Sequence, residues 1–269
     1  MILHHGLETG TLEHESKRSE SMSRIVCWFS CGAASAVATK LTIAQYAGSG
    51  REIVIARCIV KEEHPDNDRF AADCEKWFGM PITNMIAEKY EGSIYKVFEK
   101  RGYISGINGA PCTRLLKKKV REDFQKPTDT HIFGYCAEEQ NRWDSFLDAN
   151  NINAFSPLIE RGLEHPDCLA MVQQAGIELP IMYGLGYHHN NCIGCAKATG
   201  AGYWNKIKID FPEQFDRMAK LSRKMGVTMT KEGEKRIFLD ELKAGTGNYQ
   251  TEPEIQCGLF CEMAQGEYV

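Results

Sequence analysis

The fold of this chain is decided by residues 25–46, which read IVCWFSCGAASAVATKLTIAQY. The first five of these residues are all apolar, which is typical of a short buried strand. Ser30, Cys31 and Gly32 break the apolar run, and a helical pattern of small residues follows at 33–46. A short apolar run, a tight break and a helical pattern predict a strand, a loop and a helix in that order.

The same unit recurs along the first half of the chain. An apolar run at 53–60 is followed by a helical pattern that ends at Gly79. Strands that alternate with helices predict an α/β fold, in which a mostly parallel, Rossmann-like sheet carries helices on both faces. Further strands are predicted at 82–87 and 131–135, and further helices at 94–100, 115–124, 166–175 and 212–225.

Composition limits the class of protein. The chain has 269 residues, 43% of them hydrophobic, which suffices for one large domain or for one domain with a smaller appendage. Its 32 basic and 36 acidic side chains give a net charge of -4, so no overall basic field favours nucleic acid. No long apolar run and no secretory signal are present, so we expect a soluble, cytoplasmic protein without a membrane segment.

The chain divides into three expected parts. Residues 1–22 are polar and show no apolar period, so we expect a flexible tail, and Met22 could be the natural start. Residues 23–242 are expected to form an α/β nucleotide-binding domain, with a cluster-binding elaboration at about 143–205 where prolines and glycines punctuate short segments. Residues 243–269 are expected to form a C-terminal tail that carries two cysteines.

The loop Ser30–Ser35 has the pattern Ser-x-Gly-x-x-Ser. Small residues let the backbone approach a ligand closely, and successive amides at the start of a helix bind phosphate or sulfate. Ligands of open α/β sheets bind at the carboxyl ends of strands, and this loop follows the first predicted strand. A plain strand-to-helix turn has the same pattern, so the loop is a candidate anion site with a structural alternative.

Eleven cysteines, an odd number in a chain too long for a disulfide scaffold, point to metal or sulfur chemistry. Cys192 and Cys195 form a Cys-x-x-Cys turn, and Cys112 lies between a proline and a threonine. Two thiolates at this spacing can hold one metal or cluster, and the spacing alone fits zinc as well as iron and sulfur. A redox dithiol is the alternative, although the pair does not open a helix after the first strand as a thioredoxin-type motif would.

Several separated motifs occur in a specific order. They are the loop Ser30–Ser35, Cys112 followed by Lys117, the strand end Gly134–Arg142, the Cys192 and Cys195 pair, and Cys257-Gly258-Leu259. Together these motifs resemble the phosphoadenosine phosphosulfate reductase family, within the adenine-nucleotide α-hydrolase-like superfamily. The most similar version is common in phage and prophage genomes.

This resemblance implies an adenine nucleotide as substrate and a 4Fe-4S cluster, rather than zinc, as cofactor. It implies that Cys257 is the catalytic nucleophile and that Cys112, Cys192 and Cys195 hold the cluster. Cluster-bearing relatives use adjacent cysteines where this chain has one, so the fourth ligand is expected from the tail, with Cys261 as the candidate. The residues implied to bind the nucleotide are Ser30, Cys31, Gly32, Ala33, Ala34, Ser35, Lys117, Gly134, Glu139 and Arg142.

The chain also departs from the family pattern. ATP-cleaving members of the superfamily carry Asp where this loop has Ala34, which argues against magnesium-assisted ATP cleavage by the loop. Cys136 replaces the family's arginine in the strand-end motif and removes one anion contact. Gln256 and Phe260 replace the Glu and His that flank the Cys-Gly-Leu motif in the reductases.

Two reactions therefore fit the sequence. The leading prediction is a reductase of adenylyl sulfate or phosphoadenylyl sulfate, in which a thiol attacks the sulfate sulfur and a thioredoxin-like dithiol releases sulfite. The alternative is an iron-sulfur-dependent, nucleotide-activating sulfurtransferase that modifies DNA or tRNA, and only then would the basic run 117–121 contact nucleic acid. A nucleotide-sensing protein without enzymatic activity is a third hypothesis. A phage-encoded protein would act in the cytoplasm of the bacterial host, and a homo-oligomer is compatible with the sequence.

Substitutions of the two tail cysteines are expected to impair different properties, one the turnover and the other the iron content. Cys257→Ser should keep iron and visible absorbance but lower turnover by several orders of magnitude, because an alcohol is far less ionised than a thiol near neutral pH. Cys261→Ser should lower the iron content instead. Iron analysis and assays on anaerobically purified protein, expected to be brown with about four iron atoms per chain, check both roles. Colourless protein with stoichiometric zinc contradicts the cluster.

Overall fold

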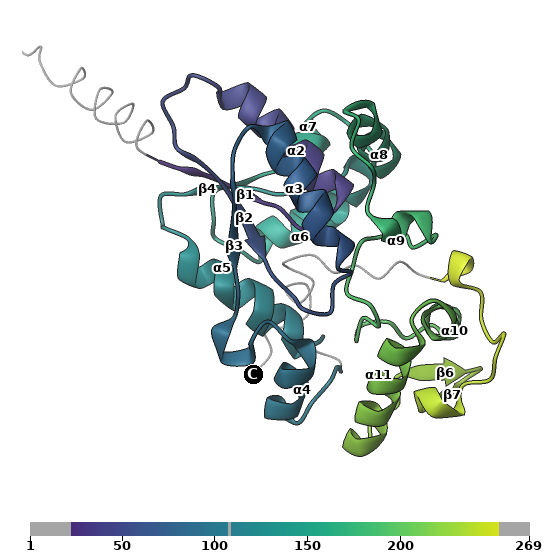
Figure 1. Cartoon of the computed structure of the whole chain (residues 1–269). Coiled ribbons are helices and arrows are strands. Elements are labelled where there is room, and N and C mark those ends of the chain that lie inside the picture. The colour runs from purple at the N-terminus through teal and green to yellow at the C-terminus, as the bar shows by residue number, and fades with distance from the viewer. Residues whose placement is uncertain (1–22, 107–108, 253–269) are drawn as a thin grey trace, which may run out of the picture.

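The computed structural model describes residues 23–106 and 109–252 and shows a five-stranded sheet (Figure 1). Every pair of neighbouring strands in this sheet is parallel, so the predicted α/β fold is confirmed. The strand order is β3-β2-β1-β4-β5, with β1 in the centre. The strands are β1 (Ile25–Trp28), β2 (Ile53–Cys58), β3 (Ile82–Met85), β4 (Thr130–Ile132) and β5 (Ala154–Phe155).

Alternate residues of β1 face opposite sides of the sheet, and both sides are covered. Ile25 and Cys27 belong to a core with α2, α3, α7 and α8, whereas Val26 and Trp28 pack with aromatic side chains of α6. A strand that is buried on both faces must be apolar throughout, which explains the continuous apolar run. The helices are α2 (Ala33–Tyr46), α3 (Asp66–Phe78), α4 (Ile94–Arg101), α5 (Lys119–Phe124), α6 (Gln140–Asp148), α7 (Pro157–Glu160), α8 (His165–Gln174), α9 (Ile181–Gly184), α10 (Ala201–Asp210) and α11 (Pro212–Met225).

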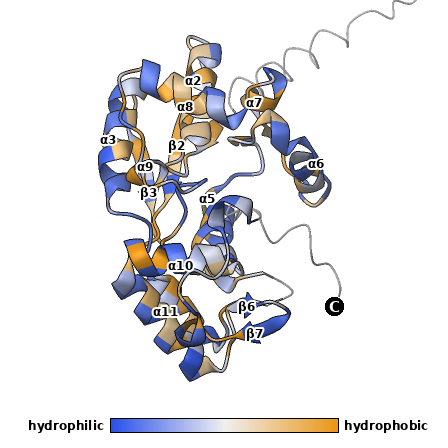
Figure 2. Ribbon diagram, turned by 90° about the vertical axis from the view of Figure 1, so that its right-hand side faces the viewer, coloured by the Kyte–Doolittle hydropathy of each residue, from blue (hydrophilic) through white to orange (hydrophobic). Residues whose placement is uncertain are grey.

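A further core lies below the sheet, where α10, α11 and the hairpin of β6 (Thr230–Glu232) and β7 (Lys235–Ile237) gather (Figure 2). Trp204 is fully buried in this core, together with side chains of α4. The predicted elaboration at 143–205 is shared between the cores, because β5 and α8 pack with the sheet and the Cys-x-x-Cys turn packs with α10. The domain boundaries themselves stay a prediction.

Several predicted elements differ from the observed ones at their ends. The strand predicted at 131–135 ends at Ile132, where its pairing with β1 stops, and the following residues leave the sheet to line a cavity. The basic helix predicted at 115–124 begins as a π-helix, η2 (Thr113–Lys118), and continues as α5. In the described part of the chain, no helix is long and apolar enough to cross a lipid bilayer. The sequence patterns did not predict α6, α7, α9, α10, β5, the β6-β7 hairpin or the short 3-10 helices η1 (Glu88–Tyr90), η3 (Ala137–Glu139), η4 (Leu239–Glu241) and η5 (Tyr249–Thr251).

An ion pair joins the residues that directly precede β1 and β4. Arg24 donates to both carboxylate oxygens of Asp129, at 2.8 and 3.0 Å, and the Asp129 side chain is fully buried. Burial alone raises the pKa of the Asp129 carboxyl, but the hydrogen bonds from Arg24 and from the backbone N–H of Lys126 outweigh it and hold this pKa below its usual value. The pair therefore stabilises the fold when the carboxyl is ionised.

Asp129→Ala is expected to lower the free energy of unfolding at neutral pH by about 2–4 kcal/mol, because it leaves Arg24 without its buried partner. Since the folded pKa of Asp129 lies below the unfolded one, the stabilisation is complete at neutral pH and is lost as pH falls through the folded pKa. Urea unfolding at neutral and acidic pH measures both effects. Asp123→Ala, which breaks the exposed pair with Lys119, is the matched control and should change little.

Candidate active site

A cavity of about 460 Å³ opens where β1 and β4, which lie side by side in the sheet, both end. The order β3-β2-β1-β4-β5 reverses direction at this pair, and open α/β sheets bind ligands at such a point. The loop after β1 and the residues after β4 form its walls. Of the ten residues predicted to bind a nucleotide, eight line this cavity: Ser30, Gly32, Ala34, Ser35, Lys117, Gly134, Glu139 and Arg142.

The loop after β1 is held in shape by the hydroxyl of Ser35. This hydroxyl donates to the carbonyl of Gly32 at 2.9 Å and accepts from the backbone N–H of Ser30 at 3.1 Å. Cys31 between them adopts a left-handed conformation, with φ of 58°, which turns the chain from the strand into α2. The N-terminus of α2 consequently lies at the cavity, where its backbone dipoles favour an anion.

Cys31 and Ala33 are the predicted nucleotide-binding residues that do not line the cavity. The Cys31 thiol is buried, contacts the carbonyl of Asn67 and has its pKa raised far above the usual value by burial. The Ala33 backbone N–H donates to the hydroxyl of Tyr183 at 3.4 Å. Both residues therefore hold the loop against neighbouring elements.

A glycine is required sterically at Gly134, after β4, and not at Gly32 in the loop. A Cβ atom added at Gly134 would lie 2.7 Å from the backbone of Ser35, closer than any real contact. A Cβ atom added at Gly32 would first meet the Tyr183 hydroxyl at 3.4 Å, an ordinary contact, and the backbone of Gly32 is extended. Gly134 is therefore required by the packing of the chain itself, whereas the close approach of a ligand to Gly32 stays a prediction.

The two predicted cationic side chains at the cavity are each paired with a carboxylate. Lys117 donates to Glu63 at 3.1 Å, and both side chains are largely buried. Arg142 pairs with Glu139, whose second carboxylate oxygen accepts the backbone N–H of Cys136 at 3.0 Å. The cavity is therefore polar, and each of its two predicted cationic side chains already has a carboxylate partner.

The basic run 117–121 does not form a free cationic face. Lys118 and Lys119 each pair with an acidic side chain one helical turn further on, and Arg121 is buried. The structure thus gives no support to this run as a nucleic-acid contact.

Sequence reasoning missed part of the cavity wall. Trp28, Phe133 and Tyr135 line one part, and His165 and Tyr183 line another. The predicted strands at 25–29 and 131–135 contained these aromatic residues, but their pattern did not show that they line a cavity. His165 and Tyr183 carried no signal, because they reach the cavity from α8 and α9, which are separated from the loop by more than a hundred residues.

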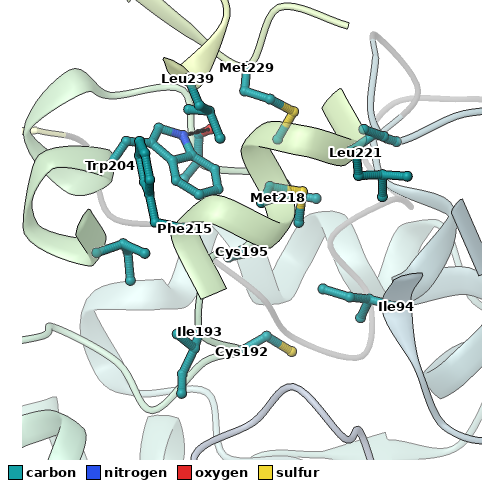
Figure 3. Close-up of a cluster of buried hydrophobic side chains, with 14 of the residues drawn as sticks. Ile94, Cys192, Ile193, Cys195, Trp204, Phe215, Met218, Leu221, Met229 and Leu239 are labelled. Atoms are coloured by element: carbon teal, nitrogen blue, oxygen red, sulfur yellow. Dashed lines mark hydrogen bonds between the residues drawn. The ribbon is translucent and has the colours of Figure 1, made fainter. Parts of the chain in front are cut away.

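The predicted metal ligands of the described chain lie in and against the core below the sheet. Cys192 and Cys195 are buried on one turn beneath Trp204 and Phe215 (Figure 3), and Cys112 packs against the same core. Within residues 23–106 and 109–252, however, no three His, Cys, Asp or Glu side chains are arranged to hold a metal ion. The described residues alone thus do not fit a cluster, and Cys257 and Cys261 lie outside them.

The chain that leads to these tail cysteines is anchored next to the Cys-x-x-Cys turn. Glu252 accepts backbone N–H groups of Gly202 and Tyr203 at 2.6 and 2.9 Å, at the start of α10. The hydroxyl of the same Tyr203 accepts the backbone N–H of Cys195 at 2.8 Å. Tyr203 therefore hydrogen-bonds both Glu252 and the Cys-x-x-Cys turn. Cys257 follows five residues after Glu252, and a fully extended chain of that length measures about 17 Å.

Comparisons with known proteins identify no family for this chain. No protein-family model matches it, and no curated protein matches its sequence. Among solved structures it is similar to the U34-tRNA thiolase NcsA from Methanococcus maripaludis with its 4Fe-4S cluster, with 11% identity and a TM-score of 0.39. That match covers 93% of this chain and 86% of the thiolase chain. A similarity this low bears on no residue of the site, and the resemblance to the reductase family stays a prediction.

Gly134→Ala is expected to lower the free energy of unfolding by about 1–3 kcal/mol, because the added methyl group meets the backbone of Ser35 and cannot be accommodated by a side-chain rotation. Gly32→Ala is the control in the loop itself and should change stability little. Urea unfolding of both variants makes the comparison. Equal losses would show that the two glycines have the same role.

Proposed function

We propose that this protein is an adenine-nucleotide-dependent enzyme of sulfur transfer, with its nucleotide in the cavity between β1 and β4. One observation carries the nucleotide assignment: the cavity lies at the point where the strand order reverses, and its lining includes both aromatic and polar side chains. Trp28 and Phe133 suit the flat, apolar face of a base. Ser30, Ser35 and the N-terminus of α2 suit phosphate groups.

Thiols support the sulfur chemistry. Cys136 belongs to the cavity lining, and the anchor at Glu252 starts the cysteine-bearing tail beside the Cys-x-x-Cys turn. The cluster predicted from the resemblance would be held by Cys112, Cys192, Cys195 and Cys261, and it would supply a site that carries sulfur. Because the described cysteines do not assemble three ligands, no step is assigned to it.

The balance of charge favours a sulfurtransferase over a reductase. Adenylyl sulfates bring several negative charges, whereas the cationic side chains Lys117 and Arg142 are already paired with Glu63 and Glu139. A nucleoside triphosphate whose charge is partly neutralised by its magnesium ion needs fewer cationic partners than phosphoadenylyl sulfate does. In this reaction the triphosphate activates an oxygen of the acceptor, and sulfur replaces that oxygen with release of the nucleotide.

One observation favours the reductase as second candidate. Ala34 lines the cavity, so at this position the loop offers no carboxylate for a magnesium-bound triphosphate. A reductase needs no such carboxylate, because its thiol attacks the sulfate sulfur of a nucleotide that is already activated.

Anaerobic assays of the full-length protein separate the candidates. A sulfurtransferase is expected to convert ATP only with a persulfide donor, a thiol that reduces the transferred sulfur, and a tRNA or DNA acceptor, with thiolated product measured by mass spectrometry. The reductase would release sulfite from adenylyl sulfate and a dithiol without any acceptor. Arg142→Met, matched with the exposed control Arg236→Met, should weaken ATP binding by about tenfold or more, because bound phosphates compete with Glu139 for the Arg142 guanidinium and the variant loses this charge-assisted contact. Failure of calorimetry to detect any adenine nucleotide would refute both candidates.

A further inference from the structure

Two buried thiols lie together beside the cavity, and neither belongs to the predicted metal ligands or to the predicted nucleophile. Cys136 follows β4 and is 1% exposed, and Cys168 lies on α8 and is 0% exposed. Both belong to the core that covers the α2 face of the sheet, and neither is in a disulfide. Cys136 also contributes to the lining of the cavity.

Two hydrogen bonds clamp the backbone around these thiols. The backbone N–H of Ala137 donates to the carbonyl of Leu163 at 2.8 Å, and that of His165 donates to the Glu138 carboxylate at 3.0 Å. These bonds bring the residues after Cys136 to the start of α8, one helical turn before Cys168. The two thiols then hydrogen-bond each other.

Two other cysteines of the described chain contact oxygen atoms instead. Cys27 hydrogen-bonds the side chain of Thr42, and Cys58 lies against the carbonyl of Lys117. A thiol that faces an oxygen has no route to a disulfide without a large rearrangement. Two thiols that already face each other can form a disulfide when their sulfur atoms move closer together.

We propose that Cys136 and Cys168 are a redox-modification site, which a small disulfide that enters the cavity converts reversibly into an intramolecular disulfide. The Cys136 sulfur attacks one sulfur of the oxidant, forms a mixed disulfide and expels the first thiolate. Cys168 then attacks the Cys136 sulfur and expels the second thiolate. The pair loses two protons and two electrons, the oxidant becomes two thiols, and an added dithiol reverses both steps.

The state of this pair acts on the nucleotide site, and this part of the inference rests on the proposed function. An S–S bond of about 2.05 Å is shorter than any contact between two thiols, so its formation draws Cys136 and α8 together. The backbone N–H of Cys136 is held by Glu139, and Glu139 holds Arg142. Displacement of Cys136 therefore displaces a carboxylate and a guanidinium that both line the cavity.

The resting state of the pair is the dithiol. The hydrogen bond with Cys168 and the burial of the site hold the pKa of the Cys136 thiol far above its usual value. A protonated thiol is a poor nucleophile, and the low exposure of both residues excludes bulky reagents. The pair is thus protected from oxidants that do not fit the cavity.

The test uses the full-length, anaerobically purified protein and 2-hydroxyethyl disulfide as the oxidant. After alkylation and digestion, mass spectrometry is expected to find a peptide that joins Cys136 to Cys168. The affinity for AMP, measured by calorimetry, should fall by about fivefold or more on oxidation, the lower end of ordinary coupling between sites. Dithiothreitol should restore it.

Two variants keep the test decisive. Cys136→Ala, which lacks the thiol that attacks the oxidant first, should give no joined peptide, and its AMP affinity should be the same with and without oxidant. Cys27→Ala, the control at an equally buried thiol, should keep both responses. Oxidation of other thiols without the joined peptide overturns the modification site, and a joined peptide with unchanged AMP affinity overturns the coupling. If the reduced protein binds no AMP, the proposed function fails, while the joined peptide still decides the modification site.

Discussion

The close approach of Gly134 to Ser35 is the constraint on which the candidate site depends. No side chain fits between them, so the chain leaving β4 runs directly against the first turn of α2. This contact brings the Ser35-stabilised loop and the strand-end residues to the two sides of one cavity. Cys136, Glu139 and Arg142 follow at fixed distances along the chain, so their positions are set by the same contact.

A chain of polar contacts joins the sheet to the core below it. Glu63 accepts from Lys117 and, through its other oxygen, from Asn67. Asn67 accepts from Asn190, which also donates to the carbonyl of Cys31 at 2.7 Å. Asn190 lies two residues before the Cys-x-x-Cys turn. The loop at the cavity and the cysteine turn are therefore linked through buried hydrogen bonds, which are expected to be cooperative and costly to break.

Much of the fold could be predicted because its signals are local. The helix predicted at 33–46 has these bounds, and Gly79 and Gly226 end α3 and α11 in the left-handed conformation expected of a helix cap. Elements that form only through contacts with residues far away in the sequence have no local pattern that predicts them. The two residues of β5 are a strand only because β4 lies beside them.

The same limit applies to the site. The resemblance to the reductase family named eight residues that line the cavity, and most of them follow β1 or β4, whose carboxyl ends lie side by side. It could not show that Cys31 points into the core or that Lys117 is paired with Glu63, 54 residues away in the chain. It also could not show that Cys136 faces Cys168, since that contact depends on how α8 packs.

The anchor at Glu252 has a consequence for competition between thiols. A short tether converts the meeting of a tail cysteine with the Cys-x-x-Cys turn into an intramolecular event, with an effective concentration in the millimolar range. A free thiol such as a small-molecule reductant must therefore reach about that concentration before it competes for the same partner. Glu252 sets where such a tether begins, because it accepts the backbone N–H groups of Gly202 and Tyr203 beside the turn.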